Sequence, residues 1–249
     1  MIRSSLRLLL LIGFLSLTGW SLAKTASLPF KLKPFAAARP PSNSPPTRTV
    51  QEVVQTVGPA AEKALKPAFA AAKVPYPPRE VAFLAFKREK RLELWARQAQ
   101  PWVFIQEFPI LAASGGSGPK LKEGDRQVPE GIYRVEGLNP NSRYHLSLKL
   151  NYPNAFDLAQ ARHDKRENVG SDIFIHGRAV SIGCLAMGDP VSEQLFVLAA
   201  RVGVGQVKVI IAPRDFRKEP WTAEPEPDPS WLPTLYRDLD AALAPFAVP

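Results

Sequence analysis

Apolar residues recur along the middle of the chain with two different periods, and each period predicts one type of element. From Val50 to Ala72 they fall three and four positions apart, which is the spacing of one face of an α-helix. Pro59 and Pro67 lie inside this stretch and predict one kinked helix or two short ones, because proline lacks the amide that an interior turn needs. Pro75 to Pro78 closes the segment, so we place a helical N-terminal region at residues 50–78.

Short runs rich in β-branched and aromatic residues follow, and each predicts a β-strand. These runs are bounded by charged or turn residues and lie at 81–87, 91–96, 102–109, 131–135, 144–150, 172–176 and 207–212. One helix is predicted among the later runs, with Asp189 as its N-cap, Pro190 at its first position and an apolar stripe from Val191 to Val202. The sum is a mainly β domain with peripheral helices, of the α+β class, and closer to a sandwich or barrel than to a doubly wound sheet.

Proline is concentrated towards the two ends of the chain. The 26 prolines among 249 residues are about twice the usual share of roughly 5%. Residues 24–49 cannot bury a core with this composition and are predicted to form a semi-rigid linker. Residues 215–249 form a second proline-rich extension that ends in an amphipathic stretch, 231–243, typical of a short helix. We therefore place the main folded domain at residues 79–214.

The first 23 residues have the pattern of an export signal. Arg3 and Arg7 precede an apolar run at 8–15, and Ser21-Leu22-Ala23 offers small residues at the two positions that a signal peptidase reads. The run is shorter than the roughly 20 residues of a membrane span, although an uncleaved anchor is the alternative. The absence of a cysteine here excludes a lipid-modified end. We expect a periplasmic or cell-envelope protein that touches a membrane only if the signal stays uncleaved.

The net charge of +9 suits an acidic polymer, an anionic lipid or nucleic acid, and it also suits simple solubility. No run of five basic residues marks a nucleic-acid tail, so no nucleic-acid partner is expected. The three histidines and one cysteine lack the paired spacing of a structural zinc site. The glycines at 115–118 are followed by Pro119 and do not open a helix as a phosphate-binding loop does. We expect no metal and no cofactor.

Cys184 is the only cysteine in the chain, and His176 precedes it by eight residues. In an exported protein a single cysteine indicates a reactive thiol or an intermolecular bridge, with a buried structural cysteine as the alternative. A catalytic thiol needs a nearby imidazole to generate the thiolate at neutral pH. Gly177 and Gly183 allow close backbone approach, and Gly183 can present an amide to an oxyanion. This spacing alone also arises by chance in protein cores.

The segment from His176 to Asp189 resembles the active-site stretch of the YkuD-type L,D-transpeptidase domain. Its variant pattern, His-Gly-x-x-x-Ser-x-Gly-Cys-x-Ala-Met-x-Asp, resembles the YafK-like branch of that family. The stretches 118–133 and 138–154 look like two substrate-side motifs of the same branch. With three motifs in order, the resemblance runs from about Val81 to Pro213.

The resemblance implies a YkuD-like sandwich or barrel catalytic domain that acts on peptidoglycan stem peptides. It implies that Cys184 attacks the amide between an L-centre and a D-residue to form a thioester, while His176 accepts and returns the proton. It further implies that the carbonyl of Gly177 orients the imidazole and that the amides of Gly183 and Cys184 form the oxyanion hole. Ser181 belongs with these orienting residues.

The sequence departs from the common family pattern at two places. Ile182 replaces a second histidine, and Leu185-Ala186 stand where an arginine often follows. The missing arginine puts in doubt the usual grip on a substrate carboxylate. Arg178 is a candidate substitute, the alternative being a solvated surface arginine. Tyr144 and His145 are candidates to line the cleft, the alternative for His145 being a satisfied core or surface histidine.

The acyl acceptor stays open at this point. One hypothesis is L,D-transpeptidation during wall synthesis or remodelling. A second is hydrolysis that releases a wall-linked lipoprotein or a stem peptide. A third, a non-catalytic wall-binding module, is disfavoured because His176 and Cys184 are both present, and a redox thiol would lack a resolving cysteine.

Overall fold

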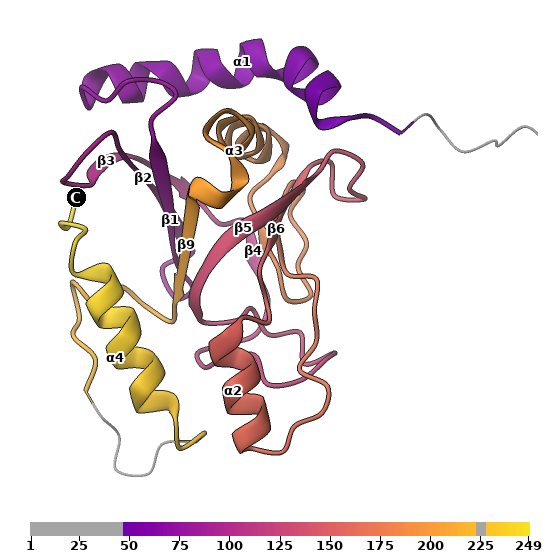
Figure 1. Ribbon diagram of the computed structural model, residues 1–249, viewed down its shortest axis with the longest axis vertical. Coiled ribbons are helices and arrows are strands. Elements are labelled where there is room, and N and C mark those ends of the chain that lie inside the picture. Colours follow the sequence, from indigo (N-terminus) through magenta and orange to yellow (C-terminus); the bar gives the residue numbers. More distant parts are fainter. Residues whose placement is uncertain (1–46, 223–227) are drawn as a thin grey trace, which may run out of the picture. The chain divides into compact units, whose positions relative to one another are not determined.

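The computed structural model describes residues 47–222 and 228–249, which belong to one compact unit (Figure 1). The predicted export signal and nearly all of the predicted linker lie outside these residues. Within the described ranges, no helix has both the length and the apolar character needed to cross a membrane.

Nine strands form one mixed sheet that curves into a half-barrel (Figure 1). The strands are β1 (Glu80–Phe86), β2 (Arg91–Arg97), β3 (Val103–Pro109), β4 (Ala112–Ala113), β5 (Gly131–Asn139), β6 (Ser147–Leu150), β7 (Phe174–His176), β8 (Leu185–Ala186) and β9 (Val207–Ala212). Their order is β3-β2-β1-β9-β5-β6-β7-β8-β4, antiparallel except at the β1–β9 and β7–β8 pairs. The predicted mainly β, α+β class is confirmed.

Strand β5 belongs to both halves of the sheet. Its first half pairs with β9 and its second half with β6, and the register shifts between Val135 and Gly137. A shift of this kind is a β-bulge, which bends a strand and increases its twist. The bend carries the sheet from the long strands β1 and β9 to the short strands β6, β7 and β8.

Helices cover both faces of the sheet. Helix α1 (Val50–Ala71) is a single helix that contains Pro59 and Pro67, and it packs with α3 (Asp189–Val202) on one face. Helix α4 (Leu232–Leu243) packs on the opposite face. Alternate residues of β1 enter the two cores, Phe83 on the α1–α3 side and Leu84 on the α4 side. Strand β1 is therefore buried on both faces.

Two helix predictions need correction. Asp189 is the first residue of α3 and not its N-cap, which is Gly188. The Asp189 carboxylate instead accepts the amide of Arg178 at 2.8 Å. Helix α2 (Ala155–His163) was not predicted, because it carries no apolar stripe. A capping box between Asn154 and Asp157 begins it.

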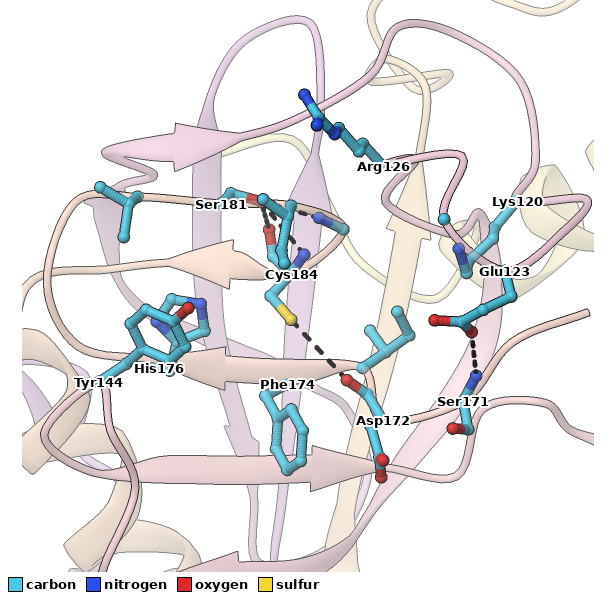
Figure 2. Close-up of a pocket in the computed structure, with 15 residues that line it drawn as sticks. Lys120, Glu123, Arg126, Tyr144, Ser171, Asp172, Phe174, His176, Ser181 and Cys184 are labelled. Atoms are coloured by element: carbon cyan, nitrogen blue, oxygen red, sulfur yellow. Dashed lines mark hydrogen bonds between the residues drawn. The ribbon is translucent and has the colours of Figure 1, made fainter.

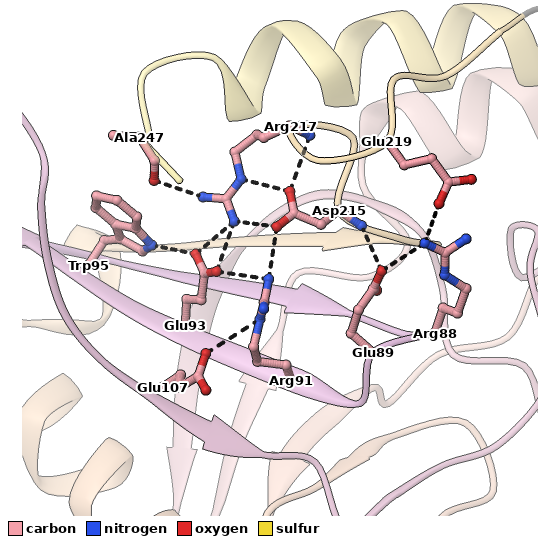
Figure 3. Close-up of polar contacts among 10 residues, drawn as sticks. All are labelled: Arg88, Glu89, Arg91, Glu93, Trp95, Glu107, Asp215, Arg217, Glu219 and Ala247. Carbon is pink, nitrogen blue, oxygen red and sulfur yellow. Dashed lines mark hydrogen bonds and ion pairs between the residues drawn. The ribbon is translucent and has the colours of Figure 1, made fainter. Parts of the chain in front are cut away.

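A polar network ties the C-terminal part of the chain to β2 (Figure 3). The Arg217 guanidinium donates to both oxygens of Glu93 at 2.8 and 3.0 Å and to Asp215 at 2.7 and 2.8 Å. Arg91 pairs with Asp215 at 2.8 Å, and Trp95 donates to Glu93 at 2.8 Å. Because Glu93 and Asp215 are buried, their charges depend on these partners.

A buried ion pair between Lys87 and Glu130 holds residues 114–130, here called the wall loop. Lys87 Nζ donates to the carbonyls of Gly118 and Val128 and to Glu130 Oε1, each at 3.0 Å. The other oxygen of Glu130 accepts the Tyr236 hydroxyl of α4 at 2.9 Å. The two stems of the wall loop and helix α4 therefore meet at one carboxylate.

Candidate active site

His176 is the last residue of β7 and is almost fully buried, with 2% of its surface exposed. Its Nδ1 lies 2.6 Å from the carbonyl oxygen of Gly177, and since a carbonyl only accepts, this nitrogen carries the hydrogen. The Nε2 atom is thereby left as a proton acceptor. Burial lowers the pKa of His176 below its usual 6.5, and the bond to Gly177 opposes this only in part. The imidazole is therefore neutral at physiological pH.

Cys184 lies directly before β8, which runs parallel to β7. The register pairs Ile175 with Leu185, so Cys184 is level with Phe174. Residues two apart on a strand point to the same face, so the register predicts that the side chains of Cys184 and His176 share a face. Both line a cavity of about 560 Å³ and an adjoining one of about 190 Å³. Figure 2 shows the Cys184 sulfur and the His176 ring in this pocket.

The Cys184 thiol is in its protonated form at neutral pH. Burial raises its pKa above the usual 9.0, and the backbone of Phe174 and the charge of Lys120 oppose the rise without cancelling it. The thiol lies 3.9 Å from the carbonyl of Asp172, a weak contact. Cysteine and histidine are therefore both neutral in the free protein.

Ser181 organises the turn that precedes Cys184. Its hydroxyl donates to the Cys184 carbonyl at 2.7 Å and accepts the amides of Gly183 at 3.2 Å and Cys184 at 3.1 Å. The amide of Ser114, in the wall loop, also points to this oxygen at 3.2 Å. The oxyanion role expected of the Gly183 and Cys184 amides stays a prediction. Both amides already donate to the Ser181 oxygen, so each would have to donate to the oxyanion as well or give up its bond to Ser181.

Tyr144 and His145, predicted together, point to different places. The Tyr144 ring stacks on His176 with 4.6 Å between ring centroids and 31° between planes, and it lines both cavities. His145 Nε2 lies 2.7 Å from Glu193 Oε1 of α3, and His145 lines neither cavity. Gly177 lies beneath this segment, where a Cβ would come within 2.8 Å of the Tyr144 carbonyl oxygen. The backbone at 144–145 therefore packs directly on the residue that orients the imidazole.

Comparison with known families places the domain that carries these residues. The family model of the L,D-transpeptidase catalytic domain, YkuD, matches residues 81–211, more than half of the chain. The chain belongs to this family. The match covers the strands and loops that carry His176, Cys184 and the wall loop.

Relatives of the domain occur among named bacterial proteins. The protein named "Putative L,D-transpeptidase YafK", from Escherichia coli strain K12 and from O157:H7, is 35% identical over 135 residues. That stretch is 53% of this chain and 52% of YafK, so the chain spans about half the length of the curated relatives it matches. The helical cell shape determining protein Pgp2 from Campylobacter jejuni is 23% identical, with a TM-score of 0.44, over 55% of this chain and 48% of Pgp2. Bd1075 of Bdellovibrio bacteriovorus is 21% identical, with a TM-score of 0.40, over 67% and 56% of the two chains.

The L,D-transpeptidase domain of this chain lines its larger cavity with charged residues that the sequence analysis did not single out. These residues are Lys120, Glu123, Arg126 and Asp172. The first three lie within the 118–133 motif, so the signal was present, but spacing alone did not show which members face the cavity. Arg178, the predicted substitute for the missing arginine, is exposed and lines neither cavity.

The described ranges contain no group of three or more His, Cys, Asp or Glu side chains arranged to hold a metal ion. The predicted absence of a metal and of a cofactor stays a prediction. The chemistry available to the site is that of a thiol and a neutral imidazole that line the same cavity, together with charged side chains.

Proposed function

We propose that the chain acts on peptidoglycan stem peptides through an acyl-enzyme on Cys184. The observation that carries this proposal is the buried His176, whose Nδ1 is held by the Gly177 carbonyl, which leaves Nε2 as the proton acceptor in a cavity that Cys184 also lines. Membership of the L,D-transpeptidase family supports the proposal, because it indicates a peptidoglycan-related enzyme.

The reaction begins from a neutral pair. His176 Nε2 takes the thiol proton as the Cys184 sulfur attacks the carbonyl carbon of the amide between an L-centre and a D-residue. The tetrahedral intermediate collapses when the imidazolium gives that proton to the leaving nitrogen, which leaves a thioester on Cys184. An incoming amine or water then attacks the thioester, loses a proton to His176, and the sulfur leaves as a thiolate that regains the proton.

The acyl acceptor defines the biological outcome. An amine acceptor on a second stem peptide makes a cross-link, which is the transpeptidase outcome we propose first. Water gives hydrolysis, and a wall-linked lipoprotein is then one substrate to be tested. Either reaction places the protein in the periplasm or cell envelope, as the export pattern of residues 1–23 also predicts.

The test incubates the full chain with purified muropeptides and, separately, with sacculi that carry covalently bound lipoprotein, and reads the products by mass spectrometry. New L,D cross-links support the transpeptidase; released lipoprotein or shortened stems support the hydrolase. The intact mass of the protein should also increase by one acyl group when the substrate is in excess.

Two variants decide whether the proposed residues carry the reaction. Cys184→Ala should abolish both products and the acyl adduct, and His176→Ala should lower the rate by at least about 100-fold, the lower end of a general base's contribution. His163→Ala is the matched control, since His163 is exposed and bonds only to its neighbour Asp164. Wild-type product formation by Cys184→Ala would end the proposal.

A further inference from the structure

The wall loop holds one arginine at the cavity with its guanidinium uncommitted. Arg126 lines the larger cavity and is exposed (Figure 2). Across the described parts of the chain, no side chain or backbone group forms a hydrogen bond or ion pair with this guanidinium. Its backbone has φ of 55°, a left-handed conformation that non-glycine residues seldom adopt. A residue is kept in such a conformation only when its surroundings fix it, and functional sites are where this occurs most often.

Asp125, the residue before Arg126, helps to hold the backbone of the loop in this conformation. The Asp125 carboxylate accepts the amides of Leu121 at 2.9 Å, Lys122 at 3.1 Å and Gln127 at 3.0 Å. It also pairs with Lys120 Nζ, whose side chain is only 5% exposed. The Lys120 ammonium is therefore already paired within the loop, although Lys120 also lines the cavity.

Gln127, the residue after Arg126, does the same on the other side. The side-chain nitrogen Nε2 of Gln127 donates to the carbonyls of Gly116 at 2.8 Å and Gly118 at 2.6 Å. Its side-chain oxygen Oε1 accepts the backbone amide of Gly116 at 3.0 Å. Both neighbours of Arg126 are thus anchored while Arg126 itself is free. This is the arrangement of a side chain presented to a ligand.

Among the residues that line the larger cavity, Arg126 is the arginine, whereas Arg143 lines the smaller one. Leu185 and Ala186, where the family often has an arginine, are buried and apolar in β8. Arg178 lines neither cavity. A guanidinium has five donors in a planar fork that matches a carboxylate, and such bidentate pairs are among the stronger hydrogen bonds in proteins.

We propose that Arg126 binds a carboxylate of the stem peptide and replaces the arginine missing after Cys184. This assignment rests on the proposed function. The end of a stem peptide formed by diaminopimelate and a D-residue carries two such groups, the C-terminal carboxylate and the carboxylate on the diaminopimelate side chain. Arg126 recognises one of them, and the substrate must be amidated at each in turn to show which.

The experiment measures kcat and KM of the full chain for the free-acid peptide and for the two singly amidated peptides. Arg126→Gln should raise the KM for the free acid by about 10- to 100-fold, the effect of losing one charge-assisted hydrogen-bonded pair. One amidated peptide should show the same rise with the unchanged protein and no further rise with Arg126→Gln. Arg126→Lys should recover part of the loss, because it keeps the charge without the fork.

The matched control is Lys165→Gln, which removes another exposed cation that also has a positive φ, in this case 56°, but lines neither cavity. It should leave all KM values unchanged. Arg126→Asn, a side chain that tolerates the left-handed backbone, repeats the test if Arg126→Gln is poorly folded.

The outcomes separate this assignment from the proposed function. Turnover by the unchanged protein with the same KM in Arg126→Gln, or an equal loss on all three peptides, overturns the role of Arg126 alone. Absence of turnover and of any acyl adduct in the unchanged protein overturns the proposed function and this assignment with it.

Discussion

Burial shifts both His176 and Cys184 towards their uncharged forms, and this fixes how the site should respond to pH. The pKa of His176 lies below its usual 6.5 and that of Cys184 above its usual 9.0. A thiolate–imidazolium pair needs the opposite order of pKa values. In the proposed reaction, the proton would therefore move from sulfur to nitrogen as the sulfur attacks and not before it.

We predict that kcat/KM stays constant through neutral pH and falls only below pH 6.5, where Nε2 becomes protonated. Alkylation of Cys184 by iodoacetamide in the free protein should be slow at neutral pH, rise about tenfold per pH unit as the thiolate fraction grows, and level off only above pH 9.0. A stopped-flow or mass-spectrometric alkylation profile measures the second quantity. Fast alkylation at pH 6 would indicate a preformed ion pair and contradict the prediction.

Gly177 orients His176 and cannot carry a larger side chain. A Cβ there would lie 2.5 Å from the Asp189 carboxylate and 2.8 Å from the Tyr144 carbonyl. We predict that Gly177→Ala displaces the carbonyl that holds Nδ1 and lowers kcat by about 10-fold or more, as small misplacements of catalytic groups do. Gly205→Ala is the control, since nothing lies within 4 Å of its Cβ position. Equal kcat values in the two variants would show that the contact at Gly177 is relieved without moving the imidazole.

The sequence carried enough information to bring Cys184 and His176 to the same cavity, because both belong to one continuous motif. It did not show that Tyr144 stacks on the imidazole while His145 turns to Glu193. Those directions depend on the positive φ of His145, 73°, which alternation of polar and apolar residues does not reveal. The sequence did not show that Arg126 faces the cavity for the same reason, since its backbone is also left-handed.

At the scale of elements, the runs for β1, β2, β3 and β9 agree with the strands to within one residue at each end, whereas β5 was predicted only as far as Val135 and the shortest strands were missed. The run 207–212 agrees with β9 residue for residue, because six successive residues form one buried strand. Strands β4 and β8 have two residues each, too few for any period to show. A strand was predicted at 144–150, but β6 begins only at Ser147. The residues before it pack against Gly177 in place of continuing the strand. Helix α2 shows only its capping residues in the sequence.

The clamp at Glu130 gives a prediction about how the wall loop is held. Tyr236→Phe removes one hydrogen bond to a buried carboxylate and should lower the free energy of unfolding by about 1–3 kcal/mol. The ring contact of Tyr236 with Phe216 is kept in this variant. Glu130→Ala leaves the Lys87 ammonium buried with only carbonyl partners, and should cost about 3–5 kcal/mol.

Urea unfolding of both variants, combined with KM for the stem peptide, checks this prediction. KM should rise in Tyr236→Phe as well, because the hydroxyl acts on the loop that carries Arg126. A variant that loses stability with an unchanged KM would show that the clamp serves the fold and does not position the cavity wall.

On the scale of the whole molecule, the C-terminal part of the chain completes the fold beyond the region that the family model covers. That match ends at residue 211, yet Phe216, Leu239 and Phe246 are buried against the sheet face opposite α1 and α3. The Arg217 network holds the start of this part on β2 (Figure 3). Tyr236 of α4 in turn donates a hydrogen bond to Glu130 at the end of the wall loop. The loop that lines the candidate active site is therefore bonded to a segment outside the family match.

Arg217→Ala tests the hold of the Arg217 network through stability. It leaves the buried carboxylates of Glu93 and Asp215 with Arg91 as their remaining ionic partner, and should lower the free energy of unfolding by about 3–5 kcal/mol at pH 7. Arg237→Ala is the control, because Arg237 is exposed and bonds only within α4. It should change stability by less than about 0.5 kcal/mol.

The pH dependence of that difference identifies the ionic contribution. Burial alone would raise the pKa of Asp215, but Arg217 and Arg91 outweigh it and hold the pKa below its usual 3.8. A carboxyl group whose folded pKa is depressed contributes stability above its unfolded pKa, and that contribution is lost as the pH falls through the folded pKa. The gap between wild type and Arg217→Ala, measured by urea unfolding, should therefore be constant from pH 7 to about 4.5 and narrow below about 4. A gap that stays constant down to pH 3 would mean that Arg217 acts through packing on Phe86 and not through Asp215.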